Sequence, residues 1–267
     1  MGYFQVTEPL GGVYRLCGEG VNYATLVCGR DGALLFDTGL GLGDIRREAE
    51  ELTRLPLTVV NSHEHADHIG GNAFFPEVWM TAQCRRALTE APLREIRERV
   101  LAAQKSLPPE LEREEYLSRG CGRARRLMPG QVFDLGGRTL HVVPLPSHTA
   151  GSVGLYCPAL ELLLSADSVA PMVSLIWPDS LTSEGHLRML EGLEGLRFRH
   201  MLCSHSAELM PKEALKLFRE SARTLRQQDD FPYRESFYPE ASGRMCLYNG
   251  EEGAAILIVK EEELEDD

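Results

Sequence analysis

The sequence predicts an α/β protein built on mixed β-sheets, and three observations support this prediction. Short apolar runs separated by glycine-rich turns recur along the 267-residue chain, as is typical of strands joined by hairpins. Amphipathic stretches at helical spacing lie between some of these runs. Where such a helix joins two strands, the strands are expected to pair in parallel, so hairpins and crossovers together predict mixed sheets.

The first part of the chain is predicted to contain hairpins followed by a strand–helix–strand unit. The tetrapeptide Gly29–Gly32 is a strong hairpin signal between two apolar runs. Apolar residues at helical spacing predict a helix over Asp44–Arg54. The expected strands are three between Val13 and Leu40, including Asn22–Cys28 and Ala33–Phe36, then Leu55–Val60 and Val78–Thr81.

Residues 83–127 differ in composition from the rest. They are rich in Arg, Glu, Leu and Ala, and Pro108-Pro109 interrupts them. We interpret them as an insertion of two or three helices without a strand. Four arginines cluster in eight residues; a solvated loop or helix face is the favoured interpretation, and an anion-binding patch is the alternative. These arginines are Arg119, Arg123, Arg125 and Arg126.

The remainder repeats the plan of hairpins followed by helices. Gly136-Gly137 predicts a hairpin between Val132–Leu135 and Arg138–Val143. A second hairpin, over about 244–259, is expected to cap a sheet edge or support a homodimer contact. One domain over 1–260 is predicted, followed by an acidic tail without a fold at 261–267. Further strands and helices are expected at Ser152–Cys157, Leu162–Ser165, Leu181–Leu196 and Lys212–Gln227.

Composition and charge narrow the class of protein. Apolar residues make up 43% and charged residues 25% of the chain, as is ordinary for a globular protein. The net charge of −12 disfavours nucleic acid as a partner. No apolar run predicts a membrane span, and the N-terminus has no secretion-signal pattern. The seven cysteines are dispersed and form no Cys-x-x-Cys pair, so we expect reduced thiols. Together with the missing signal and span patterns, this predicts a cytoplasmic location. The partner that we expect is a small-molecule substrate.

Four potential metal ligands lie within six residues, directly after a predicted buried strand: His63, His65, Asp67 and His68. Imidazoles and a carboxylate packed this closely lose solvation without gaining partners unless they bind a cation. In extended peptide, His63 and His65 point the same way. A helix beginning near Ala66 would turn Asp67 and His68 toward a neighbouring position. One short loop can therefore serve two metal ions.

Three further potential ligands, His148, Asp167 and His205, each follow an apolar strand-like run. Grouped by chemistry, the candidates offer three imidazoles to one metal, a carboxylate with two imidazoles to another, and a carboxylate that can bridge them. Nitrogen and oxygen donors without thiolate, with a position open for water, are typical of a catalytic site. The groups are, in that order, His63, His65 and His148; Asp67, His68 and His205; and Asp167.

With these motifs the chain resembles the metallo-β-lactamase superfamily of metallohydrolases. The resemblance rests on the His-x-His-x-Asp-His run at 63–68, His148 before Thr-Ala-Gly-Ser, Asp167, His205 and the Asp37-Thr38-Gly39 turn. It implies a four-layer αββα sandwich of two mixed β-sheets, with metals held on loops at one sheet edge. The matching residues cover most of the chain in the family's order.

The resemblance also implies hydrolysis with two divalent metal ions, zinc by default, although iron or manganese suit the same donors. A hydroxide bridging the ions would cleave a thioester, ester or lactone, and Asp67 would orient it. Asp167 is typical of the superfamily's glyoxalase II-like thioesterases, lactonases and phosphodiesterases, whereas true β-lactamases usually lack it. The alternatives are a mononuclear iron enzyme similar to persulfide dioxygenases and a phosphodiesterase or nuclease.

Residues beside the ligands are assigned supporting roles. Asp37 follows a buried strand, so we expect it to accept a hydrogen bond from a ligand histidine and fix its tautomer. The segment Pro171–Pro178 follows Asp167 and is the best lid candidate. Apolar residues near ligand loops are predicted as substrate walls, with core packing as the equal alternative: Phe74, Phe75, Ile176 and Trp177. The other histidines in strand or helix patterns are interpreted as structural: His141, His186 and His200.

Overall fold

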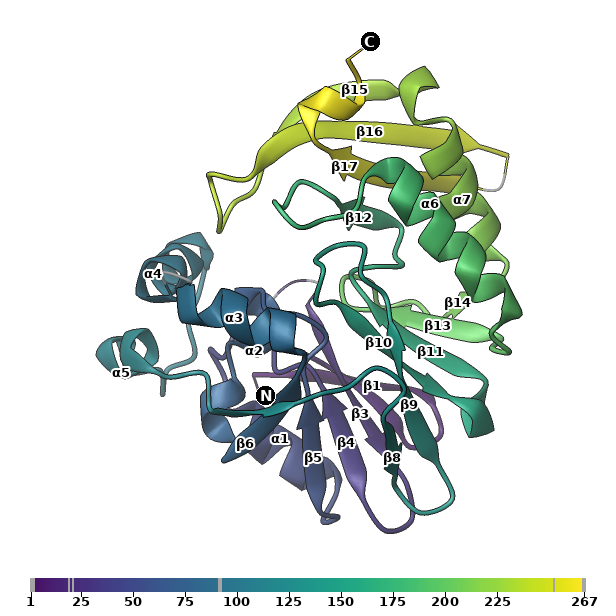
Figure 1. The fold of residues 1–267 in the computed structure, drawn as a ribbon. Helices are drawn as coiled ribbons and strands as arrows, with labels where there is room; N and C mark the ends of the chain where they lie inside the picture. Colours follow the sequence, from purple (N-terminus) through teal and green to yellow (C-terminus); the bar gives the residue numbers. More distant parts are fainter. Residues whose placement is uncertain (1–2, 19, 21, 91–92, 252, 266–267) are drawn as a thin grey trace. The chain divides into compact units, whose positions relative to one another are not determined.

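The computed structural model describes residues 3–18, 20, 22–90, 93–251 and 253–265. The chain forms two compact units. The N-terminal unit is Met1–Val142 with Ser204–Ala207, and the C-terminal unit is Val143–Cys203 with Glu208–Asp267. Both contain helices and strands (Figure 1), which agrees with the predicted α/β class. One domain over residues 1–260 stays a prediction.

The N-terminal unit is built on a seven-stranded sheet whose strands follow the order of the sequence. Strands β1 to β4 are antiparallel neighbours, and β4 to β7 pair in parallel. The hairpin predicted at Gly29–Gly32 joins β3 to β4, whereas β1 was not predicted. The strands are β1 (Gln5–Leu10), β2 (Val13–Cys17), β3 (Tyr23–Cys28), β4 (Ala33–Phe36), β5 (Leu57–Val60), β6 (Glu77–Met80) and β7 (Arg123–Arg126).

Parallel pairing of β4 with β5 needs a crossover, and helix α1 (Ile45–Leu52) provides it. Asp44 caps this helix, because its carboxylate accepts a hydrogen bond from the Arg47 backbone N–H at 3.0 Å. Ile45 and Ala49 lie one turn apart and are buried in the apolar core of this unit. The predicted strand–helix–strand unit is therefore confirmed.

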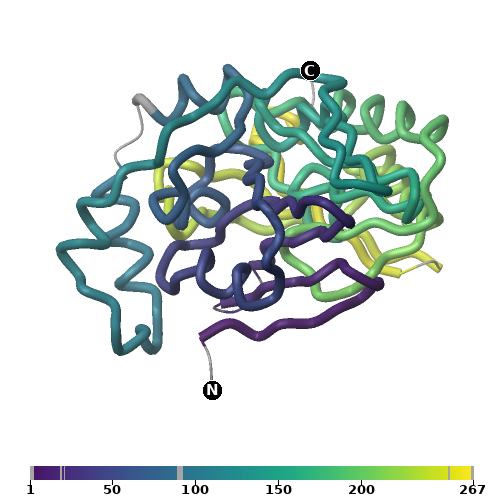
Figure 2. The backbone as a smooth tube through the Cα atoms, turned by 90° about the horizontal axis from the view of Figure 1, so that it is seen from below, coloured from purple at the N-terminus to yellow at the C-terminus, as the bar shows by residue number. Residues whose placement is uncertain are grey.

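The region predicted as a helical insertion contains α3 (Ala82–Glu90), α4 (Leu93–Ala103) and α5 (Arg113–Ser118), whose path is visible in blue to teal in Figure 2. The prediction that it has no strand is wrong, because Arg123–Arg126 forms β7 at the sheet edge. Arg125 pairs with Glu77 at 3.1 Å and lies over the Trp79 ring at 5.1 Å. Charged residues are suited to an exposed edge, where they discourage further strand pairing.

The hairpin predicted around Gly136-Gly137 joins β8 (Val132–Asp134) to β9 (Thr139–Pro144). Both glycines have positive φ, at 78° and 77°, a conformation that residues with a Cβ rarely adopt. The predicted turn is therefore confirmed.

The C-terminal unit contains strands in the order β14-β13-β11-β10. β11 pairs in parallel with β13 and antiparallel with β10, while β14 is antiparallel to β13. This arrangement brings the carboxyl ends of β11 and β13 to the same edge. The strands are β10 (Val153–Cys157), β11 (Leu162–Ala166), β13 (His200–Cys203) and β14 (Met210–Pro211).

A second sheet in this unit has the order β12-β17-β16-β15. The antiparallel pair of β16 and β17 confirms the predicted C-terminal hairpin, whereas β12 and β15 were not predicted. β12 lies in the segment expected to be a lid. Residues 172–174 of that segment are fixed in a sheet by pairing with β17, and Leu175 is fully buried, so this part of the segment is not a lid. The strands are β12 (Met172–Ser174), β15 (Asp229–Arg234), β16 (Ser242–Gly250) and β17 (Gly253–Val259).

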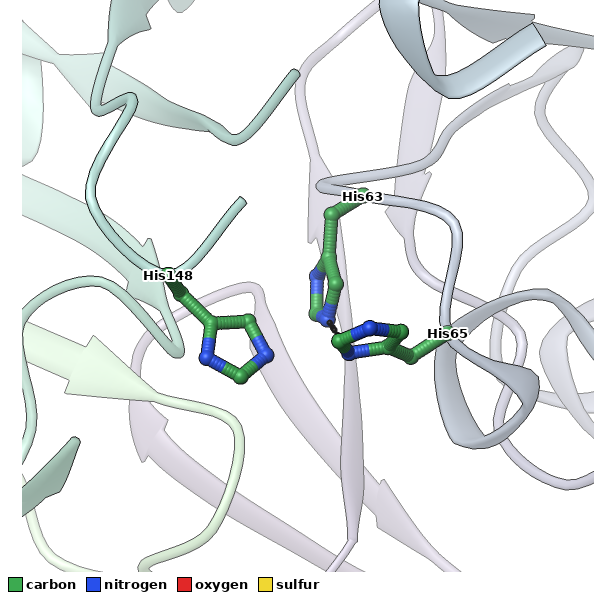
Figure 3. Close-up of side chains that lie close together, drawn as sticks. All are labelled: His63, His65 and His148. Carbon is green, nitrogen blue, oxygen red and sulfur yellow. Dashed lines mark hydrogen bonds between the residues drawn. The ribbon is translucent and has the colours of Figure 1, made fainter. Parts of the chain in front are cut away.

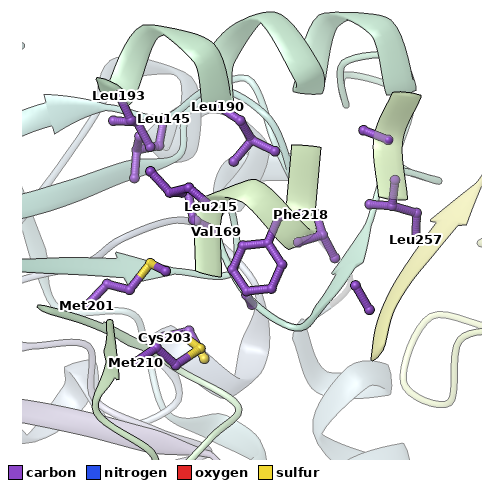
Figure 4. Close-up of a cluster of buried hydrophobic side chains, with 14 of the residues drawn as sticks. Leu145, Val169, Leu190, Leu193, Met201, Cys203, Met210, Leu215, Phe218 and Leu257 are labelled. Carbon is purple, nitrogen blue, oxygen red and sulfur yellow. The ribbon is translucent and has the colours of Figure 1, made fainter. Parts of the chain in front are cut away.

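Helices α6 (Ser183–Gly192) and α7 (Ala214–Arg223) contribute to the core of the C-terminal unit. Leu190 of α6 and Phe218 of α7 are buried together with Met201 of β13 and Leu257 of β17 (Figure 4). The short helices are α2 (Ala66–Ile69) and the 3₁₀ turns η1 (Asn72–Phe74), η2 (Pro158–Leu160), η3 (Leu193–Gly195), η4 (Leu225–Gln227) and η5 (Glu261–Glu263).

The expectation of an acidic tail without a fold is wrong for its first residues. Glu261–Glu263 forms η5, and the Glu263 carboxylate accepts a hydrogen bond from the Ser183 backbone N–H at 2.6 Å. Leu264 packs against the core of the C-terminal unit. Residues 266–267 lie outside the described residues. The acidic sequence therefore docks at the first turn of α6, where carboxylates are favourable.

Two further findings concern the whole described chain. None of the helices found among the described residues is long and apolar enough to cross a membrane. The seven cysteines are free, as expected from their dispersed positions.

Candidate metal centre

The motif at 63–68 lies between the end of β5 and the start of α2. His65 has extended backbone angles and precedes the first helical residue, Ala66. His63 and His65 are placed on the same side of this short peptide, as Figure 3 shows, with ring centroids 4.7 Å apart. The Nε2 atom of His63 lies 3.1 Å from Nδ1 of His65. The local prediction that these two side chains point the same way is confirmed.

The second half of the motif meets His205 within the N-terminal unit. One ligand atom from each of Asp67, His68 and His205 lies within 4.8 Å of the others. The Asp67 Oδ2 atom is 3.4 Å from His68 Nε2 and 3.3 Å from His205 Nε2. A carboxylate and two imidazoles therefore converge, as the sequence predicted, although His205 is distant in sequence.

Asp37 forms hydrogen bonds that orient His68 and Ser62. Its Oδ1 atom accepts a hydrogen bond from the Ser62 backbone N–H at 2.7 Å. Its Oδ2 atom accepts from the Ser62 hydroxyl at 2.7 Å and contacts Nδ1 of His68 at 2.9 Å. Since a carboxylate only accepts, His68 carries its proton on Nδ1 and presents an unprotonated Nε2 toward Asp67 and His205. The hydrogen bond predicted between Asp37 and a histidine of the motif is confirmed.

Ser62 extends this orientation to a second histidine. Its hydroxyl proton is donated to Asp37, so the same oxygen can accept a hydrogen bond from Nδ1 of His63 at 2.9 Å. His63 then offers an unprotonated Nε2 as well. His63 and His68 are almost fully buried. Their arrangement fits metal ligands held in a fixed tautomer.

The backbone around Asp37 is tightly constrained. Asp37 itself has a φ of 68°, a left-handed conformation that is uncommon outside glycine. A Cβ placed on Gly70, at the end of α2, would lie 2.2 Å from the carbonyl carbon of Leu40. The loop after β4 and the end of α2 therefore approach each other so closely that only glycine fits. Strain of this kind is typical of functional sites.

The loop carrying His205 is fixed by a buried arginine. Arg15 on β2 is 1% exposed, and its guanidinium donates to the Ser206 carbonyl at 2.7 Å and to the Thr25 hydroxyl at 3.0 Å. The Tyr23 backbone N–H donates to the Ser204 carbonyl at 2.9 Å. These bonds hold the residues on both sides of His205 against β2 and β3. No pattern in the sequence indicated this contribution of Arg15.

Asp67 is held in its ionised form. Burial opposes ionisation, but when His68 and His205 are protonated in the absence of a metal ion, their charges and hydrogen bonds outweigh burial and hold the pKa of Asp67 well below its usual range. The Asn22 side chain also donates to Asp67 Oδ2 at 3.0 Å. Asp67 is therefore an oriented carboxylate at neutral pH. Asn22 was missed from the sequence, where it resembles any polar residue at a strand start.

The C-terminal unit holds the two remaining candidates. His148 Nε2 lies 3.8 Å from Asp167 Oδ2, and its Nδ1 is 2.7 Å from the Ser174 carbonyl. Because a carbonyl only accepts, His148 is protonated on Nδ1 and directs Nε2 toward Asp167. Asp167 follows Ala166, which has a positive φ of 48° at the end of β11. The predicted ligand pair is thus brought together within this unit.

The remaining histidines have structural environments. His186 is buried on α6 with Nδ1 2.6 Å from the Ser147 hydroxyl, and burial lowers its pKa from 6.5 to about 4. His141 lies 3.0 Å from the Thr139 hydroxyl on β9, and His200 is half-buried at the start of β13. Their interpretation as structural residues agrees with these positions.

The predicted substrate walls are largely core residues. Phe75 is buried in the core of the N-terminal unit, and Phe74 packs against it with Arg119 over its ring at 4.6 Å. Ile176 and Trp177 are 6% and 8% exposed and belong to an apolar cluster of the C-terminal unit. The core-packing alternative therefore describes these four residues better than a wall or lid.

Comparison with curated proteins finds distant relatives that are named as thioesterases. The chain is 28% identical over 158 residues to the acyl-coenzyme A thioesterase MBLAC2 of Homo sapiens, covering 54% of this chain and 57% of the relative. It is 30% identical over 163 residues to the Gallus gallus protein of the same name, covering 57% and 59%. The match thus spans little more than half the length of these curated relatives.

Comparison with solved structures finds the same fold. A metallo-β-lactamase family protein from Thermus thermophilus matches with a TM-score of 0.60 and 22% identity, covering 82% of each chain. The inverting sec-alkylsulfatase Pisa1 from Pseudomonas sp. matches with a TM-score of 0.63 and 16% identity, covering 84% of this chain and 42% of that one. These likenesses confirm the predicted fold class.

The family model of the metallo-beta-lactamase superfamily matches residues 17–212. This range includes all seven predicted ligands, the Asp37 turn and the loop that carries His205. The chain therefore belongs to the metallo-β-lactamase superfamily.

Proposed function

We propose that this protein is a hydrolase that uses two divalent metal ions to cleave acyl thioesters. The observation that carries the proposal is the convergence of Asp67, His68 and His205 on one position, with His68 held in a single tautomer by Asp37. The names of the distant relatives favour a thioester over the esters and lactones that the same chemistry would cleave.

The metal ligands are assigned as the sequence predicted. In this proposal His63, His65 and His148 would hold one ion, Asp67, His68 and His205 would hold the other, and Asp167 would be shared by both. The donors fit such ions: each is a nitrogen or a carboxylate oxygen, and none is a thiolate. The buried, unprotonated Nε2 atoms of His63 and His68 support the assignment, since neutral imidazole is the form that binds metals. Zinc is the ion that we propose, and this donor set also suits iron and manganese.

Divalent ions in such a centre would lower the pKa of a coordinated water and polarise the carbonyl of a substrate. The role of the protein residues is to orient the water and the metal ligands. Asp67 is the catalytic residue that we propose, because its ionised carboxylate can accept a hydrogen bond from water and align it. The Asn22 side-chain amide donates to Asp67 Oδ2 at 3.0 Å and so fixes the rotation of that carboxylate, while Asp37 fixes the ring of His68.

Hydrolysis of acyl-coenzyme A by the zinc-loaded protein tests the proposal. The ultraviolet absorbance of the thioester bond is the preferred readout, because a thiol reagent would also react with the protein's free cysteines. We expect loss of the thioester signal, and removal of metal with a chelator should abolish it. Cleavage of a lactone or phosphodiester but not of any thioester would refute the substrate class.

His205→Gln and His200→Gln form a matched pair for this experiment. Both residues are in the 200–205 segment, but only His205 is close to Asp67. His205→Gln should lower bound metal and hydrolysis together, whereas His200→Gln should change neither. Equal activity in the two variants would argue against His205 as a ligand.

We also propose a cellular location and a partner for the enzyme. Seven free cysteines favour a reducing compartment, so we propose a cytoplasmic location. The partner that we propose is the small-molecule substrate.

A further inference from the structure

We infer that the C-terminal sheet of this protein is a positioning element for the metal centre, acting on His148 through Ser174 and Trp177. The inference rests on the proposed function, in which His148 is a ligand. It assigns a role to strands β15 to β17, which begin at Asp229 and lie beyond the matched range of 17–212. All the contacts described below lie within the C-terminal unit.

The first connection is a hydrogen bond to β12. The Ser174 carbonyl lies 2.7 Å from Nδ1 of His148, and it sets both the tautomer and the ring plane of that histidine. Ser174 is the last residue of β12, and a strand of three residues has little stability alone. The position of this carbonyl therefore depends on what β12 is paired with.

β12 is paired with the C-terminal strand β17. The two strands run parallel, with Ser174 opposite Ile258. Hydrogen bonds at both ends fix the register: Ile256 N–H donates to the Pro171 carbonyl at 2.8 Å, and Leu175 N–H donates to the Ile258 carbonyl at 2.6 Å. A shift of β17 would therefore move the carbonyl that holds His148.

The second connection passes through Trp177. Its ring lies edge-on to the His148 ring at 5.8 Å between centroids and edge-on to the Tyr238 ring at 5.2 Å. These spacings are within the range of favourable aromatic pairs. Tyr238 belongs to the segment between β15 and β16, so the C-terminal sheet also supports His148 from the side of its ring.

The loop after Trp177 holds the backbone of the ligand. The Ser180 hydroxyl donates to the His148 carbonyl at 2.6 Å, and it accepts from the Trp177 backbone N–H at 3.1 Å. The Asp179 carboxylate accepts from the Ala150 N–H at 3.0 Å. Ring, backbone and tautomer of His148 are thus all set by residues 174–180, and these are anchored on β17 and Tyr238.

β16 also packs closely against residues 174–177, so its position affects theirs. A Cβ on Gly243 would lie 2.1 Å from the Val259 carbonyl oxygen and 2.8 Å from the Cγ2 atom of Ile176. Only glycine fits here, so β16 lies directly against Ile176, the neighbour of Trp177. The sheet and residues 174–177 therefore form one packed body in which small displacements are felt.

The test measures zinc affinity by competition with a chromogenic chelator, in the full-length Tyr238→Ala and Tyr238→Phe proteins. Tyr238→Ala removes the ring that supports Trp177, and we expect zinc bound by the weaker site to lose about 10-fold in affinity. Tyr238→Phe keeps the ring and should restore native affinity. Phe231→Ala is the control, since Phe231 lies on β15 of the same sheet but is 51% exposed.

Native zinc affinity in a folded Tyr238→Ala protein would overturn the inference, as would an equal loss in Phe231→Ala. If Tyr238→Ala does not fold, Trp177→Phe replaces it: this smaller ring should weaken zinc binding with a normal unfolding transition, and unchanged affinity would overturn the inference. Failure of the proposed function is distinguishable. In that case native protein would bind zinc without cleaving thioesters, and the dependence of zinc affinity on Tyr238 would remain.

Discussion

Replacement of Asp37 by asparagine separates the charge of this residue from its shape. The φ of 68° at Asp37 is one that asparagine tolerates better than most residues, so Asp37→Asn adds little backbone strain. The asparagine Oδ1 atom can still accept from the Ser62 N–H. Its Nδ2 atom then faces Nδ1 of His68, which must accept and so moves its proton to Nε2.

That proton occupies the atom that should bind metal. Changes in the residues that orient metal ligands cost about 10- to 100-fold in affinity, which corresponds to about 1.4 to 2.7 kcal/mol at 1.4 kcal/mol per tenfold change. The metal-free protein should also lose stability. Ser62 and His68 lose hydrogen bonds to a charged acceptor, and each such bond contributes about 1.5 to 3 kcal/mol to stability.

The assay is zinc competition with a chelator, together with denaturant unfolding of the metal-free protein. Asp44→Asn is the matched control, because it makes the same chemical change at the cap of α1, where asparagine is an equally good cap. The control should keep native zinc affinity and stability. A folded Asp37→Asn protein that binds zinc as tightly as the native protein would show that the Asp37 carboxylate is not needed to orient His68.

Two further predictions concern packing and pH. Gly70→Ala should destabilise the protein by about 1 to 3 kcal/mol, because the new Cβ would meet Leu40 at 2.2 Å. The control is Gly192→Ala, in open space at the end of α6, which should be neutral or stabilising by up to about 1 kcal/mol. Equal unfolding midpoints for the two variants would contradict this prediction. His186 has a folded pKa of about 4, below its usual 6.5, so the unfolded state binds more protons and stability falls as pH drops from 6.5 toward 4. Between pH 7 and 5 this amounts to about 2 kcal/mol, and urea unfolding of His186→Gln at both pH values should lack that part of the loss, while the half-buried His141→Gln should retain it.

The sequence was most informative where chemistry is crowded into few residues. The four potential ligands within 63–68 predict a metal site, because no apolar core accepts such a cluster without compensation. Hairpins were equally predictable, since Gly29–Gly32 and Gly136-Gly137 carry the conformational signal within the turn itself. The amphipathic helix α1 could be predicted because its cap and its apolar face are both local.

Features that depend on distant contacts could not be predicted. β7 has an arginine-rich sequence that resembles a solvated helix, and only its place beside β6 makes it a strand. Likewise, Pro171–Pro178 resembled a lid, yet its residues 172–174 pair with β17 in a sheet. Tertiary context overrides local propensity in both cases.

The supporting residues of the site were hidden for the same reason. Asn22 and Arg15 have no distinctive spacing, and their roles come from contacts with Asp67 and Ser206 across the unit. Ser62 adjoins the motif, so its position between a buried strand and His63 is a signal that can be used. Asp37 was predictable because a carboxylate directly after a buried strand needs a hydrogen-bond partner.

Titration of metal-free protein with zinc, while acyl-coenzyme A hydrolysis is followed, shows whether thioester cleavage depends on two bound metal ions. If seven ligands hold two ions for one reaction, thioester cleavage should be absent without metal and should rise until two zinc ions are bound per chain. Thioester cleavage by fully metal-free protein, or zinc-saturated protein that leaves every thioester intact, would contradict the account.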